Sequence, residues 1–331
     1  MQPIAFFLAL TLCAILTPIA RVIALKLHIV DFPNTSLKTH NNPTPYLGGA
    51  AIFTTIAVTM YSLILVFNIN LNTQQHGLML GAFVILIIGL IDDIRAVTPV
   101  TKLSVQLLAT FVVWSQGIGF SLFDHWTLNL AITLVWVIGV TNAFNMIDIM
   151  DGLAAGVSGI CSLFLALLLH FSGDPFNSAL MLTLSGSCLG FLAFNFNPAK
   201  IYMGDTGSLL IGFLLACTFT QWSEEKHLGY YLIVPLIILG VPLFELIFVS
   251  ILRLKDGKSP LRGSKDHFAL RLIKMGFSVK QTVLLAYAGA IVLGSIAFLI
   301  LTFRFFAYEI LGLTLVLVCL VAHKLSQVRV S

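Results

Sequence analysis

Charged residues are scarce in this chain of 331 residues. They make up 10% of the sequence, whereas hydrophobic residues make up 58%. In soluble globular proteins, roughly a quarter of all residues are charged. Apolar runs near or above the roughly 20 residues that cross a ~30 Å hydrocarbon core recur from end to end. The composition therefore excludes a soluble domain with a single anchor and predicts a protein that is embedded in lipid.

Cysteine is also rare, and its spacing excludes two kinds of site. The sequence has no CxxC pair and no cysteine spacing that is typical of metal ligation or of a disulfide framework. We interpret the cysteines as packing residues in apolar segments. The five positions are Cys13, Cys161, Cys188, Cys217 and Cys319.

Hydropathy, interrupted by charges, prolines and glycines, gives eleven candidate spans. They are 3–25, 46–68, 77–91, 103–118, 126–143, 153–170, 178–194, 207–222, 230–252, 283–302 and 304–323. Ten spans are the alternative, because the third is short and the last two are nearly continuous. No alternating strand pattern appears, and helices satisfy their own backbone groups in lipid. The sequence thus predicts an all-α polytopic membrane protein, with residues 1–331 forming one domain.

The basic residues predict the topology. With the N-terminus outside, all of the 18 lysines and arginines except Lys226 and Arg304 fall on one side of the membrane. By the positive-inside rule that side is cytoplasmic. The net charge of +4 is then explained by topology and by attraction to anionic membrane lipids, not by nucleic-acid binding. The longest polar loops, 26–45 and 253–282, are both cytoplasmic, so we expect the functional site on that face.

Two adjacent acids, Asp92 and Asp93, close the third predicted span, and Arg95 and Lys102 follow. Adjacent carboxylates repel each other, which favours the uptake of a proton or of a cation such as Mg²⁺. Solvated acids at a membrane interface are the alternative. We favour a functional role, because two acids that directly abut an apolar run are a poor way merely to end a helix.

A second polar group lies in the segment TNAFNMIDIMDGL, between the fifth and sixth spans. Asn145 and Asp148 are three residues apart, so they would share one face of a helical turn, and Asp151 would extend that face. Amide and carboxylate oxygens together suit a hard divalent cation. The alternative is a polar linker with N-cap residues for the sixth span.

Asp205 stands between glycines in the segment NFNPAKIYMGDTGSLLIG, at the start of the eighth span. Glycine lets the backbone approach a ligand closely, and a helix N-terminus offers free N–H groups to a phosphate. An N-cap role alone would also explain Asp205 or Thr206.

The loop 253–282 is dense in lysine and arginine. Positive-inside anchoring explains most of these bases. His267 and Arg271 are four residues apart, so on one helical face they would hold a phosphate or diphosphate. Mg²⁺-type ligands, phosphate-binding bases and a glycine-flanked aspartate on one membrane face together suggest phosphoryl transfer to or from a lipid.

These motifs, in this order, resemble those of the polyprenyl-phosphate N-acetylhexosamine-1-phosphate transferase superfamily, glycosyltransferase family 4. The resemblance covers nearly the whole chain and begins with DFPNTSLKTHNNPTPYLGG at 31–49. It implies that the phosphate of a polyprenyl phosphate, undecaprenyl phosphate above all, attacks the β-phosphorus of a UDP-N-acetylhexosamine. UMP leaves and a lipid-diphosphate sugar remains. The branch that it resembles most transfers GlcNAc-1-phosphate and initiates a cell-surface polysaccharide.

The resemblance also implies roles for individual residues. Asn145 and Asp205 would hold Mg²⁺, or Mn²⁺ as a substitute, on the diphosphate. Lys102 would contact phosphate, Asp151 would lie near the nucleoside, and Asp92 would face the lipid phosphate. The remaining residues, which shape the rest of the site, would be Asp93, Asp148, His267, Arg271 and Lys38. A bacterial cytoplasmic (inner) membrane location and a homodimer are compatible with the resemblance.

Two positions depart from the family pattern. Ala269 and Leu270 stand where GlcNAc-type relatives carry further histidines, and Ile149 stands where the family commonly has glycine. Within the family, the phospho-MurNAc-pentapeptide transferase of peptidoglycan synthesis is the main alternative. Outside it, a lipid or ion transporter is the alternative, for which only Glu245 lies at a suitable depth. A buried and paired or protonated Glu245 is the structural explanation.

Overall fold

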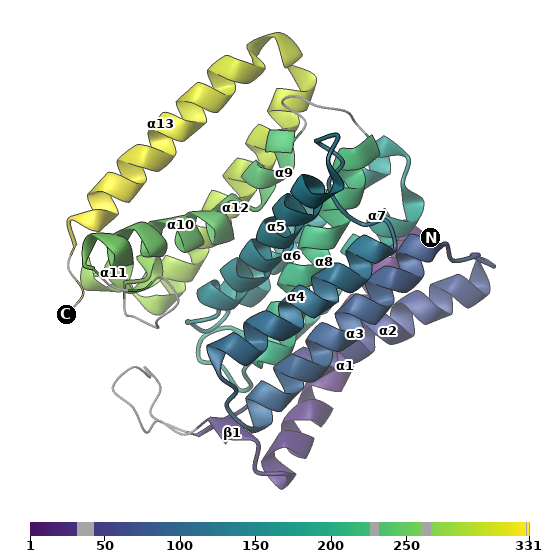
Figure 1. Cartoon of the computed structure of the whole chain (residues 1–331). Coiled ribbons are helices and arrows are strands. Elements are labelled where there is room, and N and C mark those ends of the chain that lie inside the picture. The colour runs from purple at the N-terminus through teal and green to yellow at the C-terminus, as the bar shows by residue number, and fades with distance from the viewer. Residues whose placement is uncertain (32–42, 226–231, 258, 260–265, 329, 331) are drawn as a thin grey trace. The chain divides into compact units, whose positions relative to one another are not determined.

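The structure is a computed structural model of the whole chain (Figure 1), and it describes residues 1–31, 43–225, 232–257, 259, 266–328 and 330. The chain divides into two compact units, Met1–Lys226 (unit 1) and His227–Ser331 (unit 2), which we describe separately. Lys38 lies outside the described residues. The prediction that 1–331 forms a single domain stays a prediction.

Unit 1 is a bundle of helices with one short hairpin. Strands β1 (Val30–Asp31) and β2 (Thr44–Pro45) pair antiparallel after the first helix. The helices are α1 (Gln2–Lys26), α2 (Gly48–Val66), α3 (Thr73–Ile94), α4 (Pro99–Ser115), α5 (Trp126–Ile147), α6 (Leu153–Ser172), α7 (Pro175–Asn195) and α8 (Gly204–Glu225).

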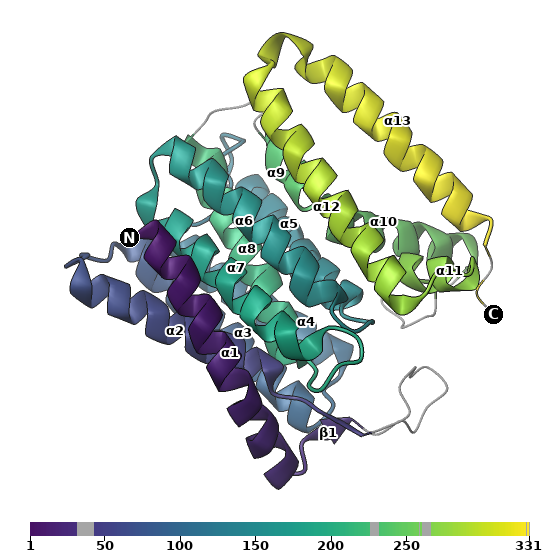
Figure 2. The ribbon, with the colours of Figure 1, turned by 180° about the vertical axis from the view of Figure 1, so that it is seen from behind.

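Helix α8 is central to unit 1, because it packs against α2, α3, α5, α6 and α7. Helices α1 and α2 pack on α7, and α1 lies along it in Figure 2. Glycine also permits a close contact between α3 and α8. A Cβ on Gly89 of α3 would lie 2.5 Å from the Thr206 Cα, so only glycine lets the end of α3 approach the first turn of α8 this closely.

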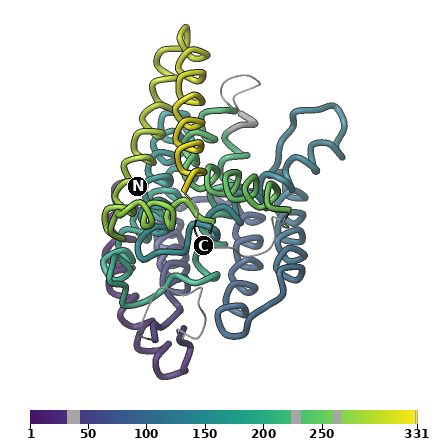
Figure 3. Tube along the Cα trace, turned by 90° about the vertical axis from the view of Figure 1, so that its left-hand side faces the viewer, coloured from purple at the N-terminus to yellow at the C-terminus, as the bar shows by residue number. Residues whose placement is uncertain are grey.

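Unit 2 contains α9 (Ile233–Ile238), α10 (Gly240–Lys255), α11 (Phe268–Lys274), α12 (Val279–Thr302), the 3₁₀ turn η2 (Arg304–Phe306) and α13 (Ala307–Ser326). Helices α12 and α13 run side by side as a hairpin, yellow in Figure 3. The predicted span 230–252 is interrupted, since α9 ends at Ile238 and α10 begins at Gly240. Pro242 has no N–H for a helical bond to the carbonyl of Ile238 and clashes with it, which explains the break.

Within the described residues, eight helices are long and apolar enough to cross a membrane. They are α1, α2, α3, α5, α6, α7, α12 and the segment Arg304–Ser326. Large apolar side chains such as Phe7 and Phe171 are 64% and 76% exposed, as lipid-facing residues are. The all-α polytopic membrane protein is thus confirmed, while the total of 10–11 spans stays a prediction. Of the five cysteines, all except Cys319 are buried.

Candidate active site

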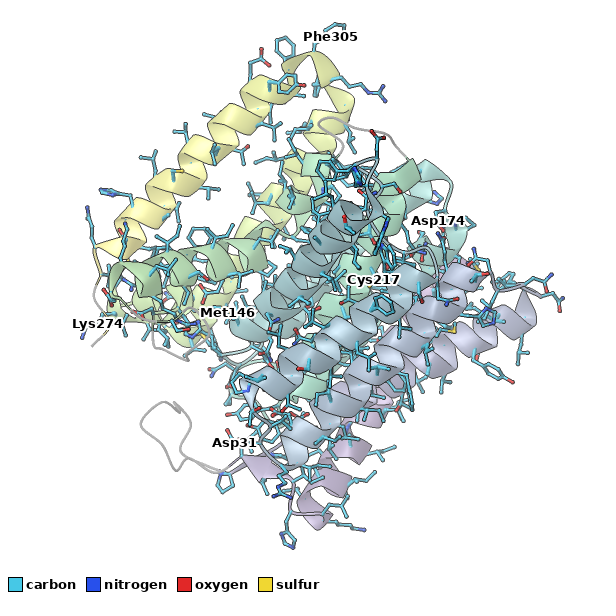
Figure 4. The ribbon with its side chains drawn as sticks, in the orientation of Figure 1. Asp31, Met146, Asp174, Cys217, Lys274 and Phe305 are labelled. Atoms are coloured by element: carbon cyan, nitrogen blue, oxygen red, sulfur yellow. The ribbon has the colours of Figure 1, made fainter. Side chains whose placement is uncertain are left out.

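The predicted site residues of unit 1 gather at one end of its bundle. Asp31 and Met146 lie toward that end and Asp174 lies toward the other, as Figure 4 shows. The carboxylates there come from the end of α3, the end of α5, the turn after it and the start of α8. We call them the acid cluster: Asp92, Asp93, Asp148, Asp151 and Asp205.

Asp93 caps α8 from another helix. Its Oδ1 accepts the Asp205 N–H at 2.7 Å, and its Oδ2 accepts the Thr206 N–H at 3.1 Å and the Thr206 hydroxyl at 2.5 Å. The N–H groups that we expected α8 to offer to a phosphate are therefore taken at these two positions. Gly204 has φ +72°, and a Cβ there would meet the Asp93 carboxylate at 2.5 Å, so this junction requires glycine. Both acids lie in the last turn of α3, so they close this helix as predicted.

Lys102, in the first turn of α4, joins two of the acids. Its Nζ lies 2.8 Å from Asp92 Oδ2 and 2.5 Å from Asp205 Oδ2. Asp92 Oδ1 also accepts the Val97 N–H at 2.6 Å, which fixes the α3–α4 turn. The ammonium thus lies where a cation between α3 and α8 would lie.

Asn145 connects α5 to the same aspartate. Its Nδ2 donates to Asp205 Oδ1 at 3.0 Å and to Ser208 Oγ at 2.9 Å. The two predicted metal ligands, Asn145 and Asp205, are thus in direct contact, although they are 60 positions apart in the sequence. For Asn145 to offer its oxygen to a cation, the amide must turn over.

Asp148 and Asp151 do not continue one helical face with Asn145, because α5 ends at Ile147. Asp148 is the C-cap residue of α5 and is half-buried. Burial first, and then the charges of Asp205, Asp93 and Asp151, raise the pKa of Asp148 to about 8. The N-cap of α6 is Gly152, so neither acid caps that helix.

Asp151 is held by the loop that precedes α8. Its Oδ2 accepts the Asn197 Nδ2 at 3.0 Å and the Ala199 N–H at 2.9 Å. Beside it, the Asn195 Oδ1 accepts the Gly152 N–H at 3.0 Å. Sequence reasoning missed both asparagines as site supports, although they stand in the quoted segment NFNPAK, because their partners lie more than 40 positions away.

Two tyrosines line the same region and were also missed. The rings of Tyr46 and Tyr202 lie 6.0 Å apart between centroids. Burial raises the pKa of Tyr202 to about 12, so its hydroxyl stays protonated. The half-exposed Tyr202 ring is suited to stacking on a planar base.

The residues present fit a magnesium ion. Within the described residues no three acidic, histidine or cysteine side chains converge in metal-ligating geometry. Mg²⁺ nevertheless commonly takes one or two carboxylates together with water and substrate phosphates. Lys102 contacts Asp92 and Asp205, whose carboxylate oxygens are hard ligands of the kind that such an ion takes.

Comparison with known proteins identifies the family. The model of glycosyl transferase family 4 matches residues 76–223. A probable undecaprenyl-phosphate N-acetylglucosaminyl 1-phosphate transferase of Bacillus subtilis is 33% identical over 294 residues, which are 86% of this chain and 80% of that protein. The chain belongs to glycosyl transferase family 4.

Two further relatives in this family cover similar shares. A decaprenyl-phosphate N-acetylglucosaminephosphotransferase of Mycobacterium tuberculosis is 32% identical over 302 residues, 81% of this chain and 74% of that protein. An undecaprenyl-phosphate alpha-N-acetylglucosaminyl 1-phosphate transferase of Escherichia coli is 27% identical over 296 residues, 85% of this chain and 78% of that protein. The residues that the family model matches include the whole acid cluster.

The predicted bases His267 and Arg271 belong to unit 2. His267 is the N-cap residue of α11, and its Nδ1 lies 2.6 Å from Glu245 Oε1. Arg271 donates to Asp266 and to the carbonyls of Leu325 and Val328. Both residues are buried, at 8% and 4% exposure. Their contacts within unit 2 therefore occupy many of the hydrogen-bond donors that we had assigned to a phosphate. Their phosphate-binding role stays a prediction.

The two departures from the family pattern are accommodated locally. Ala269 is fully buried in α11, where a small side chain fits. Ile149 is not among the residues with positive φ, so its side chain adds no strain to the turn after α5.

Proposed function

We propose that this chain transfers GlcNAc-1-phosphate from UDP-GlcNAc to undecaprenyl phosphate, giving undecaprenyl-diphosphate-GlcNAc and UMP. The observation that carries the proposal is the 33% identity, over 86% of the chain, to a protein named for this reaction. The acid cluster around Lys102 supports it, because phosphoryl transfer relies on positioning and charge neutralisation.

The reaction needs no strong base. An oxygen of the lipid phosphate forms a bond with the sugar-bearing phosphorus, the bond from that phosphorus to the bridging oxygen breaks, and its electron pair leaves with UMP. A phosphate monoester has its second pKa near ~6, so the attacking group is mostly dianionic at cytoplasmic pH. Asp92 therefore acts by positioning and by holding Lys102, not by essential deprotonation.

Each member of the site has a role in this proposal. Asn145 and Asp205 would hold Mg²⁺, which supplies neutralisation of the diphosphate charge when bound. Lys102, which contacts Asp92 and Asp205, would also contact a substrate phosphate. Asp93 keeps the start of α8 in position, and Asp148 shapes the rest of the site.

The nucleoside end of the substrate is assigned to the loop before α8. Asp151, held by Asn197 and Ala199, is positioned to accept hydrogen bonds from the ribose or base. Tyr202 offers its ring for stacking on the uracil. The predicted roles of His267 and Arg271 at the phosphates, and of Lys38 in shaping the rest of the site, are retained as part of the proposal.

The same proposal includes topology and location. The N-terminus lies outside, the membrane is the bacterial cytoplasmic (inner) membrane, and the acid cluster faces the cytoplasm with the basic loops. The lipid product initiates a cell-surface polysaccharide such as lipopolysaccharide, and the enzyme works as a homodimer.

A transporter is disfavoured by one observation. Glu245, the acid expected at membrane depth, is fully buried and accepts hydrogen bonds from His267 and from the Phe268 N–H at 3.1 Å. These contacts tie α10 to α11 and support the structural explanation of Glu245. The phospho-MurNAc-pentapeptide transferase remains the alternative within the family.

The test is UMP release by the purified chain with undecaprenyl phosphate, Mg²⁺ and a panel of UDP-sugars. We expect Mg²⁺-dependent release with UDP-GlcNAc and a loss of at least ~100-fold in Asp205→Asn, since removal of one such electrostatic group typically costs this much. Asp124→Asn, an exposed aspartate between α4 and α5, is the matched control and keeps its activity. Release only with UDP-MurNAc-pentapeptide would select the alternative, and no release with any UDP-sugar by folded protein would refute the proposal.

A further inference from the structure

An apolar groove opens between α2 and α3 of unit 1. Both helices pack on α8 but touch each other little, and the cavity between them has a volume of about 600 Å³. All of its lining side chains are apolar except Gln75 and Tyr61. Val58, Tyr61 and Phe83 at its rim are 45%, 64% and 50% exposed, so the groove opens toward the surroundings of the bundle. In a membrane those surroundings are lipid tails, since water is absent at that depth.

The groove has the length of one leaflet. Its lining runs from Phe53 to Ile64 on α2 and from Gln75 to Phe83 on α3. At 1.5 Å per residue these stretches measure about 16 Å and about 12 Å. Half of the hydrocarbon core is about 15 Å. The groove therefore accommodates a lipid tail that enters from the end of α3 opposite the acid cluster.

A polar cavity of about 510 Å³ joins the groove at that end. Gln75 and Phe176 line both cavities. We call the polar cavity the amide pocket. Its lining residues come from the N-cap and first turn of α3, the turn before α7 and the first turn of α7, and the last part of α8. Its polar members are Asn72, Gln74, Gln75, Asp174, Asn177 and Gln221.

Two buried side chains of the amide pocket carry oxygens that accept no hydrogen bond within the described residues, Asn177 Oδ1 and Gln221 Oε1. They belong to residues that are only 5% and 8% exposed. The orientation of Asn177 is fixed, because its Nδ2 donates to Asp174 Oδ2 at 2.6 Å and a carboxylate only accepts. An unsatisfied buried acceptor costs free energy, so this pocket favours a ligand with hydrogen-bond donors.

Gln221 is oriented by a chain of contacts. Gln74 Nε2 donates to the Gly117 carbonyl at 2.8 Å, which turns Gln74 Oε1 toward Gln221 Nε2, 3.5 Å away. The Gln221 oxygen is left as the acceptor. Among the described residues that line the pocket, Asp174 is the charged one, so the pocket matches a cationic donor and not an anionic one.

We propose that the groove and the amide pocket together bind one diacyl lipid with an ethanolamine head group, its tail between α2 and α3 and its ammonium at Asp174, Asn177 and Gln221. The site lies at the end of unit 1 opposite the acid cluster, so it is distinct from the site of phosphoryl transfer and does not depend on the proposed reaction. Figure 4 shows Asp174 at that end.

The test counts lipids that the full-length protein retains in mild detergent, by native mass spectrometry, after addition of matched phosphatidylethanolamine, phosphatidylglycerol or phosphatidylcholine. We expect one phosphatidylethanolamine per chain and at least ~10-fold weaker retention of the other two, a factor that corresponds to about 1.4 kcal/mol. The choline head is the sharpest comparison, because it has the same charge and no N–H donor. Equal retention of phosphatidylcholine, or a preference for phosphatidylglycerol, overturns the proposal.

Two variants locate the lipid. Ala57→Phe fills the groove from an exposed position, and Gln221→Leu removes an unpaired acceptor at little cost to the fold. We expect each to lower phosphatidylethanolamine retention about tenfold, as a change of about 1.4 kcal/mol would. Ala131→Phe, at an exposed position of α5 outside the groove, is the matched control and keeps the lipid. UMP release unchanged in all three shows that they are folded.

Other occupants give different results with the same variants. If Ala57→Phe instead abolishes retention of undecaprenyl phosphate, the groove holds the tail of the substrate. If it converts a dimer into monomers, the groove is an interface between copies of this chain. Either result, or full retention of phosphatidylethanolamine by Ala57→Phe, refutes the proposal.

Discussion

At the scale of single residues, Asp148 differs from the other acids of the cluster. Within the described residues no hydrogen bond to its carboxylate is found, whereas Asp92, Asp93, Asp151 and Asp205 each have a partner. Desolvation therefore acts on Asp148 without the compensation that hydrogen bonds give to a carboxylate. This difference makes Asp148 the group in the site that most needs a cation in order to ionise.

The raised pKa of Asp148 predicts a pH-dependent metal affinity. An aspartate ordinarily titrates near 3.9, and burial raises the pKa of Asp148 to about 8. Between these values the folded chain holds a proton that the unfolded chain has lost, so the contribution of Asp148 to stability falls as pH rises from about 4 to about 8. A divalent cation must displace that proton. We therefore expect Mn²⁺ affinity, measured by electron paramagnetic resonance without substrates, to rise up to ~10-fold per pH unit between about pH 6 and 8.

Asp148→Asn is the control for this titration, because asparagine keeps the size and has no proton to release. Its Mn²⁺ affinity should be lower and should vary less with pH over the same range. The same pH dependence in wild type and variant would contradict the assignment and would place the titrating group elsewhere in the acid cluster.

At the scale of secondary-structure elements, hydropathy predicted the helices well but not their junctions. The predicted span 153–170 corresponds to α6 (Leu153–Ser172), since apolar length alone marks a helix that crosses lipid. The contact between Asp93 and the start of α8 joins residues 112 and 113 positions apart, and no local pattern encodes such a pair. The residue types of the site could be predicted from local motifs. Which carboxylate caps a helix could not, because that depends on this distant contact.

The amide pocket could not be predicted either. Its polar residues come from three separate segments, and in the sequence each is an ordinary polar residue near a helix end. Asn72 and Asp174 do match cap patterns that a sequence shows, and both cap helices in the structure. Only the packing of α3, α7 and α8 brings these ends together around one cavity.

The junction between α3 and α8 yields a prediction about Asp93. Asp93→Ala removes three hydrogen bonds to the first turn of α8, and loss of a helix cap typically costs ~1 kcal/mol, up to ~2. We expect a lower midpoint of thermal unfolding in detergent and, because Asp205 is in that turn, a higher Mg²⁺ requirement for UMP release. Gly204→Ala should have the same two effects, since its Cβ would meet the Asp93 carboxylate.

Asp124→Ala, an exposed aspartate outside the junction, serves as the control and should leave both quantities unchanged. If Asp93→Ala unfolded at the wild-type temperature and lost only its turnover rate, Asp93 would act on the substrate itself and not through α8.

At the scale of the whole molecule, unit 1 has two chemically different ends. One end carries the acid cluster, which suits a cation and phosphates, and the other carries the amide pocket, which suits hydrogen-bond donors. Helix α3 runs between them, with Asn72 at its start and Asp93 in its last turn. A chain that spans the membrane must present these ends to opposite sides, so the location of one fixes the location of the other.

The topology can be tested with single cysteines at the two ends. Cys319, the exposed native cysteine, is first replaced by serine, and the remaining four are buried. Asp124→Cys lies after α4 and Arg95→Cys lies before it, both at exposed positions on opposite ends of that helix. Because the basic loops mark the cytoplasmic side, a membrane-impermeant maleimide should label Asp124→Cys in intact cells and Arg95→Cys only after permeabilisation. If Arg95→Cys were labelled in intact cells and Asp124→Cys only after permeabilisation, the acid cluster would lie outside. That result would contradict both the topology predicted from the basic residues and the proposed cytoplasmic reaction.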